Sequence, residues 1–173
     1  MSKFLKLNIS RKRAVFENIS YLPAAIALAQ RYKSKILDDY STENIRDFAS
    51  FFVELVEKTS PYFWVLTGKN GEFKGFVYLD DWQGSYKTPH CATVTTCIDP
   101  RYWGSFTKWA GKRFIKYVFK RFKLKKLKAE LYSGNKNAVS LLKKIGFNHE
   151  CTLKNETIVN GKPVNIELYS IIK

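Results

Sequence analysis

The sequence predicts an α+β fold in which a mixed, mostly antiparallel sheet of six or seven strands is flanked by about four helices. Two observations lead to this prediction. Apolar residues recur every three or four positions in some segments, which is the period of a helix with one buried face, whereas other segments are aromatic, β-branched or alternating, as in strands. The predicted order is two helices, a group of strands, and a tail in which strands and helices alternate. We expect a single domain over residues 1–173, because a chain of this length can bury a sizeable core.

The N-terminal part of the chain is predicted to contain one edge strand and two helices. Their expected ranges are residues 4–18 for the strand, and residues 21–32 and 44–58 for the helices. Pro23 falls in the first turn of its helix, where an amide hydrogen is not needed. Ser41 or Thr42 can cap the second helix, whose apolar residues then follow at helical spacing.

A group of strands is predicted next. Residues 62–67 and 73–79 flank the turn formed by residues 68–71, and together they are expected to form a hairpin. Residues 80–89 are expected to be a loop. The β-branched residues 91–98 then form the next predicted strand.

The longest predicted helix spans residues 105–122 and begins after a turn. Its buried face is expected to include Trp109 and Tyr117 beside four central positions, which are Phe106, Ala110, Phe114 and Val118. The lysines of this helix are four residues apart and lie in the opposite phase; they are Lys108, Lys112, Lys116 and Lys120. Like charges at this spacing repel, so we expect one lysine stripe that faces solvent or an anion.

The C-terminal tail begins with a strand at residues 125–132 and a helix that starts after Asn135. Asn135 lies at an N-cap position, and Gly146 supplies a C-terminal stop. The apolar face of this helix repeats at helical spacing, at Ala138, Leu141, Leu142 and Ile145. Two strands, residues 149–159 and 164–172, are expected to pair around Asn160-Gly161, a strong hairpin turn signal.

The chain is strongly basic, and the excess charge is local. Its 30 Lys and Arg residues outnumber 15 Asp and Glu residues, which gives a formal net charge of +15. Residues 101–128 contain basic residues and no acidic one. Such asymmetry favours a large anion as partner, which can be a phosphate-rich cofactor, nucleic acid or an acidic surface. The alternative is that the lysines are simply solvated.

Several classes of protein are excluded by composition. No apolar run is long enough for a membrane span, and no apolar segment follows Lys3 and Lys6 as in a signal peptide, so we expect a cytoplasmic protein. Three cysteines without CxxC spacing disfavour a disulfide framework or a zinc site, and we expect buried thiols in a reducing compartment. No metal is expected.

Residues 135–147 resemble the acyl-CoA-binding end of the GNAT family, the Gcn5-related N-acetyltransferases. Members commonly carry Asn-x-x-Ala/Ser, six positions, and then a hydrophobic-Gly-Phe sequence, and this chain matches at Asn135, Ala138, Gly146 and Phe147. The resemblance covers roughly residues 60–172, and the N-terminal helices more loosely. It implies a GNAT-like fold, acetyl-CoA as acyl donor, and a primary amine as acceptor.

The resemblance also implies a set of cofactor-binding residues. The family places Arg/Gln-x-x-Gly-x-Gly/Ala at a helix N-terminus that holds pyrophosphate; Arg101 and Gly104 match, and Phe106 replaces the last small residue. The remaining implied contacts are donors near this turn, the end of a strand that pairs with the pantetheine arm, and the Asn135 helix. They are Ser105, Thr107, Lys108, Cys97, Ile98, Asn135, Ala138 and Leu142.

Acetyl transfer also needs an acid for the leaving thiolate and an amine free of its proton. Many members carry a tyrosine seven residues after the motif asparagine, but Leu142 occupies that position and cannot donate. Tyr132 and Ser133 are the nearest polar alternatives. Asp81, beside Asp80, and His90 are candidates for a base or proton relay, and solvated or structural roles are the alternative for each.

Two functions therefore remain open from the sequence. One is an acetyl-CoA-dependent N-acetyltransferase acting on a small molecule or protein, as a monomer or homodimer. The other is a catalytically degenerate GNAT-like scaffold of the kind that phage and prophage genomes encode, binding nucleic acid or another partner through the lysine stripe. Phe106 and Leu142 favour the second. The acceptor pocket is expected in residues 21–47 and 80–89, and affinity for acetyl-CoA distinguishes the two functions.

Overall fold

The computed structural model describes residues 2–173 and confirms the predicted mixed fold. Seven strands form one mostly antiparallel sheet in the order β1-β4-β5-β6-β7-β9-β8, and β2 and β3 form a separate pair. Two compact units are distinguished along the chain. Unit 1 runs up to Leu79 and includes Thr96–Arg101, whereas unit 2 comprises Asp80–Thr95 and Tyr102–Lys173.

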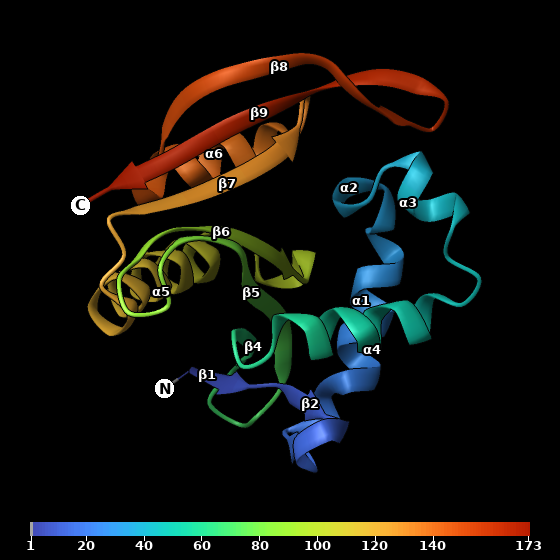
Figure 1. Ribbon diagram of the computed structural model, residues 1–173, viewed down its shortest axis with the longest axis vertical. Helices are drawn as coiled ribbons and strands as arrows, with labels where there is room; N and C mark the ends of the chain where they lie inside the picture. Colours follow the sequence, from blue (N-terminus) through green and yellow to red (C-terminus); the bar gives the residue numbers. More distant parts are fainter. Residues whose placement is uncertain (1) are drawn as a thin grey trace. The chain divides into compact units, whose positions relative to one another are not determined.

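Unit 1 contains the N-terminal strands and four helices. Its strands are β1 (Lys3–Lys6), β2 (Asn8–Ser10), β3 (Val15–Glu17), β4 (Phe63–Thr67), the part of β5 (Phe73–Gly84) up to Leu79, and the part of β6 (Pro89–Ile98) from Thr96. Its helices are α1 (Leu22–Arg31), α2 (Lys33–Ile36), α3 (Asp39–Glu43) and α4 (Phe48–Thr59). Helices α1 and α4 contact each other (Figure 1).

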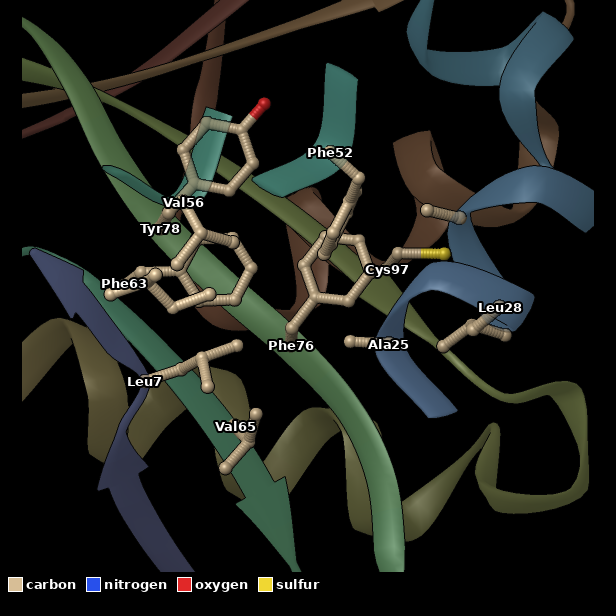
Figure 2. Close-up of a cluster of buried hydrophobic side chains, with 12 residues drawn as sticks. Leu7, Ala25, Leu28, Phe52, Val56, Phe63, Val65, Phe76, Tyr78 and Cys97 are labelled. Atoms are coloured by element: carbon tan, nitrogen blue, oxygen red, sulfur yellow. The ribbon is translucent and has the colours of Figure 1, made fainter. Parts of the chain in front are cut away.

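The core of unit 1 is aromatic. Phe52 of α4 packs edge-on against Phe63 and Phe76, with ring centroids 5.9 and 5.3 Å apart. Phe63 also stacks on Tyr78 at 5.5 Å. Figure 2 shows these rings together with smaller side chains from α1, α4, the strands and the link between β1 and β2, which are Leu7, Ala25, Leu28, Val56, Val65 and Cys97. Burial of these side chains is the main stabilising contribution in unit 1.

Two predictions for unit 1 were wrong in their boundaries. The expected strand at residues 4–18 is three short strands, because the chain turns at Ala14, whose φ of 49° is left-handed. The helix expected at residues 44–58 begins later, since Asp47 is its N-cap and accepts hydrogen bonds from the amides of Ala49 and Ser50 at 3.2 and 2.9 Å. Ser41 lies in the separate helix α3, which Asp38 caps at 2.9 Å.

The predicted loop at residues 80–89 is also shorter than expected. Strand β5 continues through Gly84, and a turn over residues 85–88 links it to β6. The amide of Thr88 donates to the Ser85 carbonyl at 3.2 Å and to the Ser85 hydroxyl at 3.0 Å, which closes this turn. A strand partner therefore outweighs the loop-like composition of these residues.

Unit 2 is a strand-and-helix tail. Its elements are α5 (Ser105–Phe122), β7 (Lys126–Tyr132), α6 (Lys136–Ile145), β8 (Asn148–Val159) and β9 (Lys162–Ile172). Strand β9 lies between β7 and β8 and is antiparallel to both (Figure 1). Helices α5 and α6 pack closely where a Cβ on Gly111 would come within 3.0 Å of the Ile145 side chain.

Strands β6 and β7 are parallel, and their register is short. It pairs Cys91–Thr93 with Lys126–Lys128 and stops there, although both strands continue. Because the two strands are parallel and a helix follows each, α5 and α6 both begin at the carboxyl edge of this pair. Ligands of open α/β sheets commonly bind at such an edge.

The local signals predicted for unit 2 are confirmed. The bounds of α5 match the prediction, and Asn160 and Gly161 both have positive φ, as a type I′ hairpin turn requires. Gly146 ends α6 with a φ of 105°, and the amide of Phe147 donates to the Leu142 carbonyl at 3.0 Å, which is a Schellman motif. Trp109 is an exception, because it is 37% exposed and does not join the buried face of α5.

Candidate functional site

The N-terminus of α5 begins with backbone amides that make no bond within the helix and that no side chain caps. The amide of Lys108 makes the first helical hydrogen bond, to the Gly104 carbonyl at 3.1 Å, so the amides of Ser105, Phe106 and Thr107 precede the helical ladder. Gly104 gives no side-chain cap and has φ 97° and ψ −119°, a conformation that favours glycine. Nothing lies within 4 Å of the position where its Cβ would be. An anion can therefore approach this backbone closely.

Two of the residues predicted to contact phosphate already form side-chain hydrogen bonds within the protein. Thr107 is buried, and its hydroxyl donates to the Tyr102 carbonyl at 3.0 Å, so this hydroxyl is not available to a phosphate. In unit 1, Arg101 forms a bidentate pair with Asp99, at 3.0 Å from Nε to Oδ1 and 2.8 Å from Nη2 to Oδ2. These bonds lower the pKa of Asp99 below its ordinary range. Backbone amides are thus the principal donors of this turn.

Asn135 has two separate functional groups at the start of α6. Its side-chain oxygen accepts a hydrogen bond from the amide of Ala138 at 3.3 Å, as predicted for an N-cap. Its Nδ2 group has no hydrogen-bond partner within residues 2–173, and the residue is half-buried. Asn135 can therefore cap the helix and also donate to a ligand.

The predicted acids at the end of β7 differ in what they contact. Tyr132 is the last residue of β7, and Ser133 lies in the turn that follows it. The Ser133 hydroxyl donates to Oε1 of Glu167 at 2.8 Å, so its proton is already committed. Tyr132 is half-buried and lies opposite Ile166 of β9. Of the two, Tyr132 is the better candidate for a proton donor.

Glu167 is the centre of a network that sequence patterns did not reveal. Its Oε2 accepts from the Thr152 hydroxyl at 2.9 Å and lies 2.8 Å from Nε2 of His149. Hydrogen bonds from Ser133, then Thr152, and then His149 lower the pKa of this carboxyl. The two β8 residues reach Glu167 because the register shifts between His149 and Cys151. This network fixes the connection between β7 and α6, on which Asn135 depends.

Asp81 and His90 both contact the chain several residues before Tyr132. Oδ2 of Asp81 is 2.6 Å from Nζ of Lys128 and 3.3 Å from the Thr93 hydroxyl. The Lys128 contact holds the pKa of Asp81 below its usual range, which makes it a poor base at neutral pH. The His90 carbonyl accepts a hydrogen bond from the amide of Lys125. Lys125 is seven residues before Tyr132, which corresponds to about 23 Å along an extended chain.

The strand-end residues Cys97 and Ile98 belong to unit 1. Cys97 is buried in the aromatic core, and this burial raises the pKa of its thiol to about 12, so it remains a neutral thiol. A Cβ on Gly75 would lie 2.3 Å from the Cys97 carbonyl oxygen, so the two backbones are in close contact. Ile98 is half-buried. Any role of these two residues in binding must use backbone groups.

A hollow of about 210 Å³ opens among the helices of unit 1, in the region expected to hold the acceptor. Its polar lining includes two cations, and its residues are Gln30, Lys33, Thr42, Ile45, Arg46 and Phe48. Within residues 2–173, Lys33 and Arg46 form no ion pair. This hollow can therefore accommodate a neutral or anionic group.

Metal and membrane features are lacking in the part of the chain that the structure describes. No group of three or more His, Cys, Asp or Glu side chains is arranged to hold a metal ion. No helix within residues 2–173 is both long and apolar enough to cross a membrane. The three cysteines are free thiols, with Cys91 and Cys97 buried as predicted.

Comparison with known proteins decides the family. Residues 20–148 match the acetyltransferase (GNAT) domain family, which is well over half of the chain. The chain belongs to the GNAT acetyltransferase family. Among curated proteins no sequence match was found.

Solved structures show the same GNAT fold. A spermidine N-acetyltransferase from Vibrio cholerae in complex with CoA and spermine is 18% identical, with a TM-score of 0.75 over 99% of this chain and 95% of that one. A GNAT-family acetyltransferase from Bacillus anthracis is 16% identical, with a TM-score of 0.73 over 99% and 94%. A ribosomal-protein-alanine N-acetyltransferase from Brucella melitensis is 18% identical, with a TM-score of 0.70 over 89% and 95%. At these identities the likeness establishes the fold.

GNAT acetyltransferases use acetyl-CoA as acyl donor. The residues of this GNAT domain fit such a group on one observation, which is the open backbone over Gly104 at the start of an 18-residue helix that has no side-chain cap. Pyrophosphate is the kind of ligand that a helix N-terminus favours, through its amides and its dipole. The absence of an acidic residue from the first turn of α5 adds to this fit.

Proposed function

We propose that this GNAT protein is an acetyl-CoA-dependent N-acetyltransferase whose acceptor is a primary amine of a small molecule or a protein. The observation that carries the proposal is the N-terminus of α5, which no side chain caps. This helix begins at the carboxyl edge of the parallel pair β6 and β7, whose pairing stops after three residues. The start of α6, with the Nδ2 group of Asn135, lies at the same edge.

The binding roles follow from the donors that unit 2 offers. The open backbone at Gly104 and the amides of Ser105 and Thr107 would hold pyrophosphate, and Lys108 would add positive charge in the first turn. Asn135 would donate to the carbonyl groups of the pantetheine arm, with Ala138 and Leu142 packing along it from α6. These contacts orient the thioester, and orientation accounts for much of the rate gain in such transfers.

The chemistry requires few side chains. The cofactor supplies an acetyl group activated as a thioester. A neutral amine nitrogen would form a bond to the acetyl carbon as the carbon–sulfur bond breaks. The thiolate would take up a proton from the protein, and the proton lost by the nitrogen would pass to water, which restores the donor. We assign the proton for the thiolate to the Tyr132 hydroxyl, because Leu142 cannot donate and Ser133 is committed to Glu167. His90 lies too far along the strand for this step, and Asp81 is held by Lys128.

Cofactor binding is tested by thermal unfolding with acetyl-CoA. A ligand at 100 times its dissociation constant stabilises the folded state by about 2.7 kcal/mol, or roughly 5–11 °C for a chain of this size. We expect Gly104→Val to lose this shift, because a branched side chain would cover the amides, and Gly161→Val to keep it, since that glycine lies in a distant hairpin turn. Both glycines have positive φ and open space at the Cβ position, so neither substitution causes a steric clash. Equal shifts in the two variants would contradict the assigned site.

The proton donor is tested by Tyr132→Phe. The change removes one hydroxyl and leaves the ring, so turnover should fall while acetyl-CoA affinity stays the same. A general acid typically contributes about 10²–10⁴-fold. A loss below about threefold would exclude Tyr132 and leave water as the donor.

For the acceptor, we propose a primary amine whose recognised part is neutral or anionic. Lys33 and Arg46 line the hollow in unit 1, and both carry uncompensated charge that would repel a polyamine. Peptides with an acidic residue beside the amine should therefore be acetylated faster than spermidine or spermine. Two results together would refute this assignment. Spermidine and spermine would be acetylated faster than the acidic peptides, and a further cationic side chain introduced into the hollow would not slow their acetylation.

A catalytically inactive scaffold is the second candidate, and the commitment of Ser133 together with Leu142 at the usual donor position favours it. The two candidates differ in one result. The scaffold predicts no release of free CoA with any amine, even where acetyl-CoA raises the melting temperature.

A further inference from the structure

We infer that the outer surface of α5 and α6 is a binding site for single-stranded nucleic acid. This surface, the basic helical face, is defined by nine exposed cations on two helices of unit 2: Lys108, Lys112, Arg113, Lys116, Lys120, Arg121, Lys136, Lys143 and Lys144. Neither helix contains an acidic residue. The inference does not depend on acetyl transfer.

The two helices form one continuous basic layer. Gly111 of α5 allows Ile145 of α6 to approach within van der Waals distance, and the neighbouring Lys143 and Lys144 are exposed at this crossing. Along α5, the stripe from Lys108 to Lys120 covers about 18 Å with a charge every 6 Å. A row of this length and regularity matches an extended polyanion better than a single small anion.

The fold leaves this charge uncompensated. None of the nine cations forms an ion pair within residues 2–173. The carboxylates of unit 2 are instead used on the sheet, where Asp81 pairs with Lys128 and Glu150 with Lys126. Cations in the last turn of a helix are stabilised by its dipole, but Lys112 and Lys116 lie in the middle of α5 and gain nothing from it. Their mutual repulsion is relieved when an anion binds.

The aromatic residues favour a single strand over a duplex. Trp109 is 37% exposed and Trp103 is 49% exposed, both at the N-terminal end of α5. Arg113 lies over the Trp109 ring at 5.2 Å, which makes a flat platform on which a base can stack. The opposite side of α5 is buried through Phe114 and Val118, and α6 packs alongside, so α5 cannot enter a major groove as a recognition helix does.

The test is fluorescence anisotropy with labelled 20-nucleotide oligo-dT and oligo-rU, measured across a salt series. The plot of log affinity against log salt should have a steep negative slope, and replacing three lysines in K112Q/K116Q/K120Q should reduce that slope by about 2, since each single-strand contact contributes about 0.7. The matched control is K12Q/K35Q/K58Q, which removes the same charge from exposed lysines of unit 1 and should leave the slope unchanged. Circular dichroism melts of both variants confirm that each is folded.

Stacking is tested separately with W109A and W109F. The alanine variant should bind oligo-dT at least about fivefold more weakly, and the phenylalanine variant should recover most of the affinity. Equal losses of slope in the two triple variants would overturn the inference in favour of net charge alone. Binding to vesicles containing 30% phosphatidylserine but not to either oligonucleotide would overturn it in favour of a membrane surface, and binding to none of these probes would overturn it outright.

Discussion

The most discriminating substitution in this GNAT domain concerns Asn135, because its oxygen caps α6 while its Nδ2 group is available for a ligand. Asn135→Ala removes both groups, whereas Asn135→Ser keeps an oxygen that can cap the helix and removes the Nδ2 donor. The two variants therefore separate stability from cofactor affinity. Asn137→Ala, at an exposed position of the same helix, is the control for general effects on α6.

The magnitudes follow from the geometry. The capping bond is long, at 3.3 Å, so its loss should cost about 0.5–1 kcal/mol, in the lower part of the range for N-caps. For a chain of this size that corresponds to a fall in melting temperature of about 1–4 °C. Loss of one neutral hydrogen bond to a ligand should cost about 0.5–1.5 kcal/mol, which is roughly a 2- to 13-fold rise in the dissociation constant for acetyl-CoA.

The assays are differential scanning fluorimetry for stability and isothermal titration calorimetry for acetyl-CoA affinity. We expect Asn135→Ala to be altered in both, Asn135→Ser in affinity alone, and Asn137→Ala in neither. If Asn135→Ser binds acetyl-CoA as tightly as the unaltered protein, Asn135 is a helix cap and no more. If Asn135→Ala melts at the original temperature, the assigned cap contributes nothing.

Three further predictions concern positions that the fold constrains. Gly75→Ala should destabilise unit 1 by at least about 3 kcal/mol in urea unfolding, because the alanine Cβ would lie 2.3 Å from the Cys97 carbonyl oxygen. An unchanged stability would show that the two strands can move apart without cost. Asp81→Asn should lower the free energy of unfolding by about 1–2 kcal/mol in the same assay, because asparagine tolerates the positive φ but leaves the largely buried Lys128 without its partner. An unchanged unfolding midpoint would mean that the ion pair is fully screened by solvent. Glu167 has a pKa below its ordinary 4.5, so the stability it contributes is present above that pH and is lost as the pH falls through the folded-state pKa. Glu167→Gln should therefore reduce the fall in melting temperature between about pH 5 and 3, and an equally steep fall in the variant would refute the assignment.

Elements with local signals could be predicted from the sequence. The helix at residues 105–122 was predicted at its observed bounds, because four turns of regular apolar spacing define it without reference to other elements. The cap at Asn135 and the stop at Gly146 were predicted for the same reason, since each depends on residues within the same helix. Family membership was predicted from these residues and is confirmed.

Features that depend on distant partners could not be predicted. Strand β5 continues through residues of loop-like composition because a strand partner holds it. The start of α4 was misplaced because Asp47 competes with two earlier capping residues, and sequence alone does not rank them. The Glu167 network requires a register shift in β8 that brings His149 beside β9, and no local pattern signals it.

The same distinction applies to the candidate site. Amide donors at the start of α5 could be predicted, because any helix N-terminus presents them. The commitment of Thr107 to the Tyr102 carbonyl, of Arg101 to Asp99, and of Ser133 to Glu167 could not, since each is decided by where a neighbouring acceptor lies. These contacts leave backbone amides, Asn135 and Tyr132 as the groups on which the proposed activity depends.

The most direct measurement of that activity is thiol release from acetyl-CoA, followed with a thiol-reactive dye in the presence of a panel of amines. The panel should contain peptides with free N-termini and acidic second residues, lysine peptides, spermidine and spermine. We predict that free CoA appears only when protein and an amine are both present, with the acetylated amine formed in equal amount by mass spectrometry. Acetyl-CoA binding without amine-dependent thiol release from any member of the panel would contradict the assignment of this protein as an N-acetyltransferase.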